Sequence, residues 1–278
     1  MIGGIELGGT KCVLAVANNP LDIIEKRIIP TKDPYSTIAE IVSFFSNFNI
    51  SKLGIGSFGP LVLNSASPDY GMLITESKKG WKGTNLVKEF SKINEEIAID
   101  TDVNAAALGE YHYGAGQASE TFVYVTVGTG IGAGVLVKGE PHRGNFHLEI
   151  GHMLIPNIDN FRGVCRIHGN CFEGLASGPA IQARWGVEAS ELSIDHEAWK
   201  KEAQLLSFGI VNIISNHSPD KIVLGGGVMN QKHLFEMIRL NVEDKWNGHT
   251  PLGNISNLIL EPALGDNSGI VGSLSLAL

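Results

Sequence analysis

The sequence predicts an α/β protein made of two lobes that face a shared cleft. Short β-branched runs alternate with helical patterns along 278 residues, a length that allows two modest hydrophobic cores. The pattern also restarts, because Ile5–Thr10 and Thr126–Ile131 are both a strand followed by a turn of glycine and threonine. Such an internal repeat is typical of a duplicated lobe. Taken alone, either motif is equally compatible with an ordinary glycine hairpin.

The first half of the chain is expected to hold one sheet with helices beside it. Runs rich in β-branched residues predict strands, and apolar residues at helical spacing predict helices. The expected strands are Ile2–Leu7, Cys12–Ala17, Ile23–Ile29, Leu53–Ser57 and Ile97–Asp100, and the expected helix is Pro34–Phe48. Asp102 is expected to be the N-cap of a further helix over residues 103–110, because Asp is a preferred cap and an alanine-rich run follows.

The second half repeats this alternation after Thr121 and contains a long irregular stretch over residues 139–178. Further strands are expected at Thr121–Val127, Gly132–Val137, Lys221–Leu224 and Asn257–Leu260. Helices are expected at His196–Asn216, Val228–Trp246 and Asp266–Leu278.

Composition and charge narrow the class of protein. The net charge is −8 and no basic block is present, which argues against nucleic acid as a partner. The N-terminus has no basic and apolar leader, and no apolar run approaches the roughly 18 residues that span a bilayer. The three cysteines, a low and odd number, fit a reducing compartment. We therefore expect a cytoplasmic protein without a signal peptide or membrane partner.

The 34 glycines are clustered, and not every cluster fits a phosphate site. Gly54–Gly59 matches the dinucleotide-binding pattern, but Pro60 comes directly after it and no helix is expected to open there. No GxxxxGK[ST] sequence is present, so a P-loop is excluded.

Three other clusters are better phosphate binders, because glycine lets backbone N–H groups approach phosphate oxygens. Threonine hydroxyls and the charge of Lys11 add to them. Together they predict a nucleotide site formed by Gly8, Gly9, Thr10, Lys11, Gly128, Thr129, Gly130, Gly132, Gly225, Gly226 and Gly227.

Motifs from Gly3–Lys11 to Gly265–Gly272 make nearly the whole chain resemble the ROK family of sugar kinases and repressors. The resemblance is strongest to the bacterial fructokinase branch of that family. It implies the actin-like ATPase (ribonuclease H-like) fold, with two lobes around a central cleft. It also implies ATP as co-substrate, Mg²⁺ as cofactor and a homodimer. The implied lobes are residues 1–112, joined by the final helix 266–278, and residues 113–265.

The resemblance also assigns the catalytic and sugar-binding residues. Asp102 matches the catalytic aspartate, which accepts the proton of the attacking hydroxyl. Without the family context, a plain N-cap aspartate is the better interpretation. We expect its carboxylate to be ionised, since a helix dipole favours an anion at the N-terminus. The implied hexose ligands are Glu149, His152 and Glu173, with Asn104 and Gly59 as additions.

Some positions depart from the usual family pattern, and they do so as the fructokinase branch does. Glu6 stands where Asp is usual, near the magnesium-bound phosphates. Thr101 replaces a sugar-contacting Asn, and His147-Leu148 replaces Ala-Gly. These departures argue against a glucokinase more than against kinase activity.

Cys165, His168 and Cys171 succeed one another at three-residue intervals, and with His152 they make a Cys2His2 set. Four such ligands form a tetrahedral zinc site. The alternative is a loop with unligated cysteines. Zinc on one nitrogen of His152 would leave the other for a sugar hydroxyl. Cys12 is expected in the core.

The leading hypothesis is therefore ATP-dependent phosphorylation of the 6-hydroxyl of D-fructose. The main support for fructose is the resemblance of Tyr70-Gly71 and Lys78–Trp81 to the fructokinase branch. Mannose, glucose or an N-acylhexosamine remain alternative acceptors. A sugar-responsive regulator is a further alternative, but family regulators carry a helix-turn-helix head, whereas this chain begins with a strand.

Overall fold

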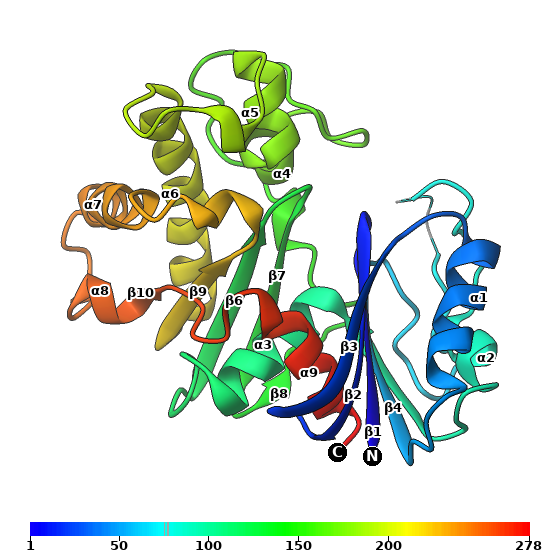
Figure 1. The fold of residues 1–278 in the computed structure, drawn as a ribbon. Coiled ribbons are helices and arrows are strands. Elements are labelled where there is room, and N and C mark those ends of the chain that lie inside the picture. Colours follow the sequence, from blue (N-terminus) through cyan, green and yellow to red (C-terminus); the bar gives the residue numbers. More distant parts are fainter. Residues whose placement is uncertain (75, 77) are drawn as a thin grey trace.

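The computed structural model describes residues 1–74, 76 and 78–278, which form two α/β lobes lying side by side (Figure 1). The first lobe contains one five-stranded sheet. Its first three strands form an antiparallel meander, and the other two run parallel to the first strand. The sheet order is β3-β2-β1-β4-β5, from β1 Ile2–Leu7, β2 Lys11–Asn19, β3 Asp22–Pro30, β4 Lys52–Ser57 and β5 Ile97–Thr101.

The second lobe repeats this connectivity. Again three strands form a meander, and two further strands run parallel to its first member. The order is β10-β9-β6-β7-β8, from β6 Thr121–Val127, β7 Ile131–Val137, β8 Glu140–Pro141, β9 Lys221–Gly225 and β10 Ile259–Leu260. The two glycine hairpins therefore occupy equivalent places in two equivalent sheets, and the duplication predicted from the sequence is confirmed.

Two helices cover the outer face of the first sheet, and a larger set surrounds the second sheet. Helix α1, Pro34–Phe45, begins after Asp33, whose side chain caps Ser36, and it buries its apolar face on the sheet. The short α2 is Leu86–Phe90. The second lobe carries α4 Phe172–Ala176, α5 Gly178–Trp185, α6 Ala198–His217, α7 Leu234–Trp246 and α8 Ile255–Leu258, with 3₁₀ turns at Ile150–His152, Ala189–Glu191 and Gly227–Asn230.

Helices α3, Asp102–Tyr113, and α9, Ser268–Leu276, cross between the two lobes (Figure 1). Their backbones touch, because a side chain at Gly272 would overlap the carbonyl oxygen of Ala105. Helix α9 closes the first sheet through Ile270 and Leu274, whereas Ala107 of α3 joins the core of β6 and β7. The final helix thus packs on the first lobe, although the exact lobe boundaries stay a prediction.

Several sequence expectations were wrong in detail. Thr101, not Asp102, is the N-cap of α3, and its hydroxyl accepts the N–H of Asn104. The helix expected over Val228–Trp246 is a 3₁₀ turn and a separate helix, because Gln231 leaves the helical region. Of the strand expected over Asn257–Leu260, the first two residues end α8 and only Ile259–Leu260 form β10. The stretch over 139–178 contains β8 and α4. Within the described residues, none of the helices combines the length and apolarity needed to cross a membrane.

Candidate active site

The parallel strands of the first sheet bring three functional segments to one edge. Leu7, Ser57 and Thr101 are register partners at the ends of β1, β4 and β5. The residues directly after them, Gly8, Phe58 and Asp102, must therefore lie together, because parallel strands end at the same edge. This edge faces the second lobe, where Gly132 and Gly134 pack against Val103 of α3. The fold thus places Asp102 near both glycine turns.

Burial decides the electrostatics of Asp102. Removal from water raises the pKa of its carboxyl from 3.8 to about 6, although backbone N–H groups at the helix start, chiefly that of Val103, lower it. The helix terminus therefore only partly offsets desolvation. A carboxylate with this pKa is still mostly ionised at neutral pH and accepts a proton more readily than an ordinary aspartate.

Glu6 lies on β1 close to Asp102 and to the start of α9. Its carboxylate packs against Gly269, and its buried Oε2 has no hydrogen-bond partner within residues 1–74, 76 and 78–278. Burial and the charge of Asp102 raise the pKa of Glu6 to about 7, while Lys11 and Lys26 lower it. A buried, unpaired carboxylate oxygen in an acidic cluster suits a hard cation, because Mg²⁺ prefers oxygen ligands. The residues therefore fit the Mg²⁺ implied by the sequence.

The first phosphate turn, Gly8–Lys11, closes the β1–β2 hairpin. The N–H of Gly8 donates to the carbonyl of Lys11 at 3.0 Å, while Gly9, Thr10 and Lys11 are exposed. Thr31 supports the turn, since its hydroxyl donates to the Gly8 carbonyl at 2.7 Å and its N–H to Thr10. The turn is thus held rigidly by β3 and presents its free groups outward.

The second phosphate turn, Gly128–Gly130, closes the β6–β7 hairpin. Glu173 of α4 supports it, because its Oε2 accepts the N–H of Ile131 at 3.1 Å. The turn lies beside the third glycine cluster, where an added Cβ at Gly128 would be 3.8 Å from the N of Gly227. Gly227 has free space around it, whereas Gly225 and Gly226 pack against Tyr124 and the β6 backbone. Gly227 is therefore the member of that cluster best able to approach a ligand.

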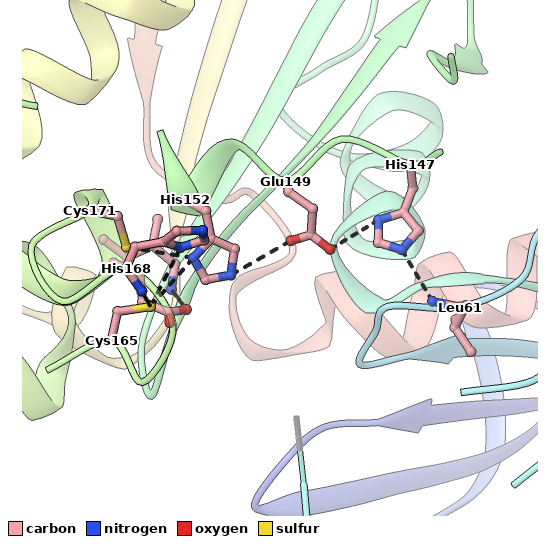
Figure 2. Close-up of polar contacts among 9 residues, drawn as sticks. Leu61, His147, Glu149, His152, Cys165, His168 and Cys171 are labelled. Carbon is pink, nitrogen blue, oxygen red and sulfur yellow. Dashed lines mark hydrogen bonds and ion pairs between the residues drawn. The ribbon is translucent and has the colours of Figure 1, made fainter. Parts of the chain in front are cut away.

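Glu149 and His152 lie on the same side of the 3₁₀ turn, as their spacing predicted. Glu149 Oε2 is 4.0 Å from His152 Nε2, and its Oε1 is 3.5 Å from His147 Nδ1 (Figure 2). Burial and the charges of Glu173 and Asp102 raise the pKa of Glu149 to about 7. Glu149 therefore lies close enough to Glu173 and Asp102 for both of their charges to raise its pKa.

Two weaker sugar candidates have structural partners. The Asn104 side-chain nitrogen donates to Asp100 at 2.8 Å and is buried. Gly59 lies against the ring of His147, where an added Cβ would be 3.3 Å from Cε1. Their roles as hexose ligands stay predictions.

The four predicted zinc ligands come together. One ligand atom each from His152, Cys165, His168 and Cys171 lies within 4.8 Å of the others. The sulfur–Nδ1 separations are 3.5 Å for Cys171–His152 and 3.8 Å for Cys165 with either histidine (Figure 2). A tetrahedral zinc site has nitrogen–sulfur edges of about 3.5 Å. The donor set therefore fits zinc, and His152 keeps Nε2 directed at Glu149.

Sequence motifs did not reveal several residues that support the site. Lys78 reaches the first phosphate turn, where its Nζ donates to the Gly9 carbonyl at 2.6 Å. Gly178, at the start of α5, donates its N–H to the Gly128 carbonyl, and the buried Ser177 hydroxyl beside it has no partner among the described residues. These contacts join residues far apart in the chain, so no local signal could have found them.

Fold and site together describe a two-lobed phosphotransferase of the actin-like ATPase class, and comparison with known proteins identifies the family. The ROK family model matches residues 2–278, so the chain belongs to the ROK family.

Relatives are similar over their full length. A Bacillus subtilis (strain 168) protein is 43% identical, covering 100% of this chain and 95% of its own. Fructokinases from Pediococcus pentosaceus and Zymomonas mobilis are each 37% identical; they cover 100% and 99% of this chain, and 97% and 96% of their own. The structure of a Streptomyces griseus ROK glucokinase, in complex with glucose and AMPPNP, has a TM-score of 0.79 at 21% identity, covering 99% of this chain and 98% of that one.

Proposed function

We propose that this protein is an ATP-dependent hexose kinase that phosphorylates D-fructose on its 6-hydroxyl. The observation that carries the proposal is the position of Asp102 at the start of α3, on the strand edge beside Gly8, where its charge raises the pKa of both Glu6 and Glu149. The fructokinases from Pediococcus and Zymomonas, similar over the whole chain, support fructose as the acceptor.

Asp102 is assigned as the general base. Phosphoryl transfer needs the acceptor hydroxyl in line with the terminal phosphate and a group that takes its proton as the new bond forms. Asp102 begins α3 at the strand edge next to Gly8, so it can meet a hydroxyl in the cleft. Its raised pKa lets it take the proton and then release it to solvent at neutral pH.

Both phosphate turns and Lys11 are assigned to ATP. Their backbone N–H groups can surround phosphate oxygens, and Lys11 supplies a positive charge close to Glu6. Glu6 would help to hold Mg²⁺, which neutralises charge on the transferring phosphate when it is bound.

Glu149, His152 and Glu173 are assigned to the hexose. Carboxylates and imidazole suit the sugar because its hydroxyls both donate and accept hydrogen bonds. The zinc ligands would fix the tautomer and orientation of His152 through Nδ1, so that Nε2 is offered to the sugar. Glu173 would connect the hexose site to the ATP site, since the same carboxylate supports the second phosphate turn.

The resemblance to the ROK family also leads us to infer a cytoplasmic homodimer. Sedimentation of the purified protein at micromolar concentration should give a mass near twice 29.8 kDa. A sedimenting species of single-chain mass would remove this part of the proposal.

A coupled assay across fructose, mannose, glucose and N-acetylated hexosamines tests the acceptor. We expect kcat/KM for fructose to exceed that for each other hexose by at least roughly tenfold, the discrimination that one well-placed polar contact provides. A higher value for another hexose would reassign the substrate. Failure to phosphorylate any of them with ATP and Mg²⁺ would overturn the proposed function.

A further inference from the structure

His147 contacts both lobes, although it belongs to neither the zinc set nor the phosphate turns. It lies on the segment between β8 and the 3₁₀ turn of the second lobe, and its side chain is only 7% exposed. Its Nε2 accepts the backbone N–H of Leu61, a residue of the first lobe, at 3.2 Å (Figure 2). Its Nδ1 lies 3.5 Å from Glu149 Oε1.

The contact with Leu61 fixes which nitrogen carries the proton. A backbone amide can only donate, so Nε2 must present its lone pair, and the neutral ring must hold its hydrogen on Nδ1. Burial lowers the pKa of His147, which favours this neutral form. The remaining N–H is then on the nitrogen that lies 3.5 Å from Glu149 Oε1, and an ionised carboxylate can only accept.

Glu149 in turn lies between two imidazole rings. One oxygen lies near His147 and the other near His152, whose Nδ1 lies among the four predicted zinc ligands. The Glu149 side chain is 47% exposed, so it stays open to a ligand while both of its oxygens are oriented. Figure 2 shows this series running from the metal cluster through Glu149 and His147 to Leu61.

We propose that His147 is a positioning residue that links the hexose-binding carboxylate Glu149 to the Leu61 backbone, so that a hexose binds tightly only when the two lobes are held together. The inference rests on the proposed function, because it takes Glu149 as a hexose ligand. His147 itself touches neither substrate nor phosphate.

A second contact of the same segment supports this role. Arg143 forms an ion pair with Asp100, a first-lobe carboxylate that is completely buried. The other oxygen of Asp100 accepts the N–H of Thr101, the residue before the catalytic base, at 2.8 Å. Residues 143–149 therefore meet the first lobe at two places, the segment after β4 and the end of β5. A displaced segment would move Glu149 relative to Asp102.

Two substitutions each preserve one end of the histidine. His147→Gln keeps an oxygen that can accept the Leu61 N–H but cannot hold Glu149. His147→Asn keeps a shorter N–H donor for Glu149 but does not reach Leu61. If His147 acts as a link, both variants should raise the KM for hexose by at least roughly tenfold and leave the KM for ATP within about twofold, a loss typical of residues that orient a ligand-binding group.

An exposed histidine supplies matched controls. His249, which comes after α7 in the second lobe, offers His249→Gln and His249→Asn variants that should behave as wild type. If His147→Asn binds hexose normally, the Leu61 contact is unnecessary and the proposal is wrong. If His147→Gln binds hexose normally, the Glu149 contact is unnecessary and the proposal is equally wrong.

Hydrogen exchange of the Leu61 amide provides a readout that does not depend on kinase activity. In the protein without substrate, exchange should be at least roughly tenfold faster in His147→Asn than in wild type and close to wild type in His147→Gln. Unchanged protection in His147→Asn would overturn the link even if the protein is a fructokinase. If instead the protein phosphorylates no hexose but exchange behaves as expected, the link stands and the proposed function fails.

Discussion

The two phosphate turns occupy equivalent places in equivalent sheets, but the protein supports them differently. The first turn is held by Thr31 of the same meander and is flanked by the charged Glu6 and Lys11. The second contains no charged residue and is held by Glu173 and Gly178, which come from helices that have no counterpart in the described part of the first lobe. The first turn thus suits a metal and the reacting phosphate, and the second is tied to the sugar site.

The difference arises from the segment that succeeds each meander in the chain. In the first lobe, helix α1 begins four residues after β3 ends, and it contributes to the core. In the second lobe, residues 142–178 come after β8 and bring the proposed zinc ligands, Glu149 and Glu173. The two lobes therefore share one sheet topology and differ in the segment that comes after the meander.

Removing the charge of Asp102, at the strand edge of the first sheet, should have the largest effect on turnover. Asp102→Asn should lower kcat by roughly 10²- to 10⁴-fold, the usual contribution of a general base, while hexose binding measured by calorimetry persists. Asp244→Asn on the exposed face of α7 is the matched control and should keep wild-type turnover. A normal kcat in Asp102→Asn would show that Asp102 is not the general base.

Replacing a cysteine in each lobe tests whether the metal belongs to the second lobe only. Cys165→Ala should release zinc and raise the KM for hexose by roughly 10- to 100-fold, because the metal orients His152. Cys12→Ala, in the core of the first lobe, should keep the full zinc content and the hexose KM. Metal analysis of both variants checks this, and wild-type hexose affinity in the zinc-free protein would contradict the ligand assignment.

Alanine in each glycine turn compares their supports. An added Cβ at Gly130 would lie 2.5 Å from Glu173 Oε2, whereas one at Gly9 would meet no atom within 4 Å. Gly130→Ala must therefore displace Glu173 and should raise the hexose KM roughly tenfold, since small displacements of positioning groups are costly. Gly9→Ala should leave that KM within about twofold. Equal effects of the two substitutions would show that Glu173 does not couple turn and sugar.

The last prediction concerns stability. An unfolded aspartate titrates near 3.8, while the pKa of Asp102 in the folded protein is about 6, so folding favours its protonated form. The ionised carboxylate therefore destabilises the folded state progressively as pH rises from about 4 to 6, by about 3 kcal/mol at the plateau. Asp102→Asn should have the stability of wild type at pH 3.5 and exceed it at pH 7.5 in urea unfolding. A stability difference that does not change with pH would refute the buried charge.

Much of this architecture could be predicted from the sequence, because the strands and both glycine turns are local patterns. The clustering of the two cysteines and two histidines was also predictable, since three of these residues lie within seven residues, whereas zinc itself stays a prediction. The helix start was not, because Thr101 and Asp102 are both good caps and only the fold decides between them. The five-residue α2 is too short to show a helical period. The roles of Lys78, Thr31 and His147 depend on contacts between distant segments, which no local pattern encodes.

The packing of α9 on the first sheet also affects the order in which the two lobes can fold during synthesis on the ribosome. The part of that sheet formed by β1 and β2 stays uncovered on one face until residues 268–276 emerge, although its strands are made first. The second lobe, whose elements all precede Asp266, can therefore condense earlier, in reverse of the usual N-to-C order. Ribosome-arrested chains of increasing length should acquire protease resistance in residues 121–260 before residues 2–101. The opposite order would show that the first sheet folds without α9.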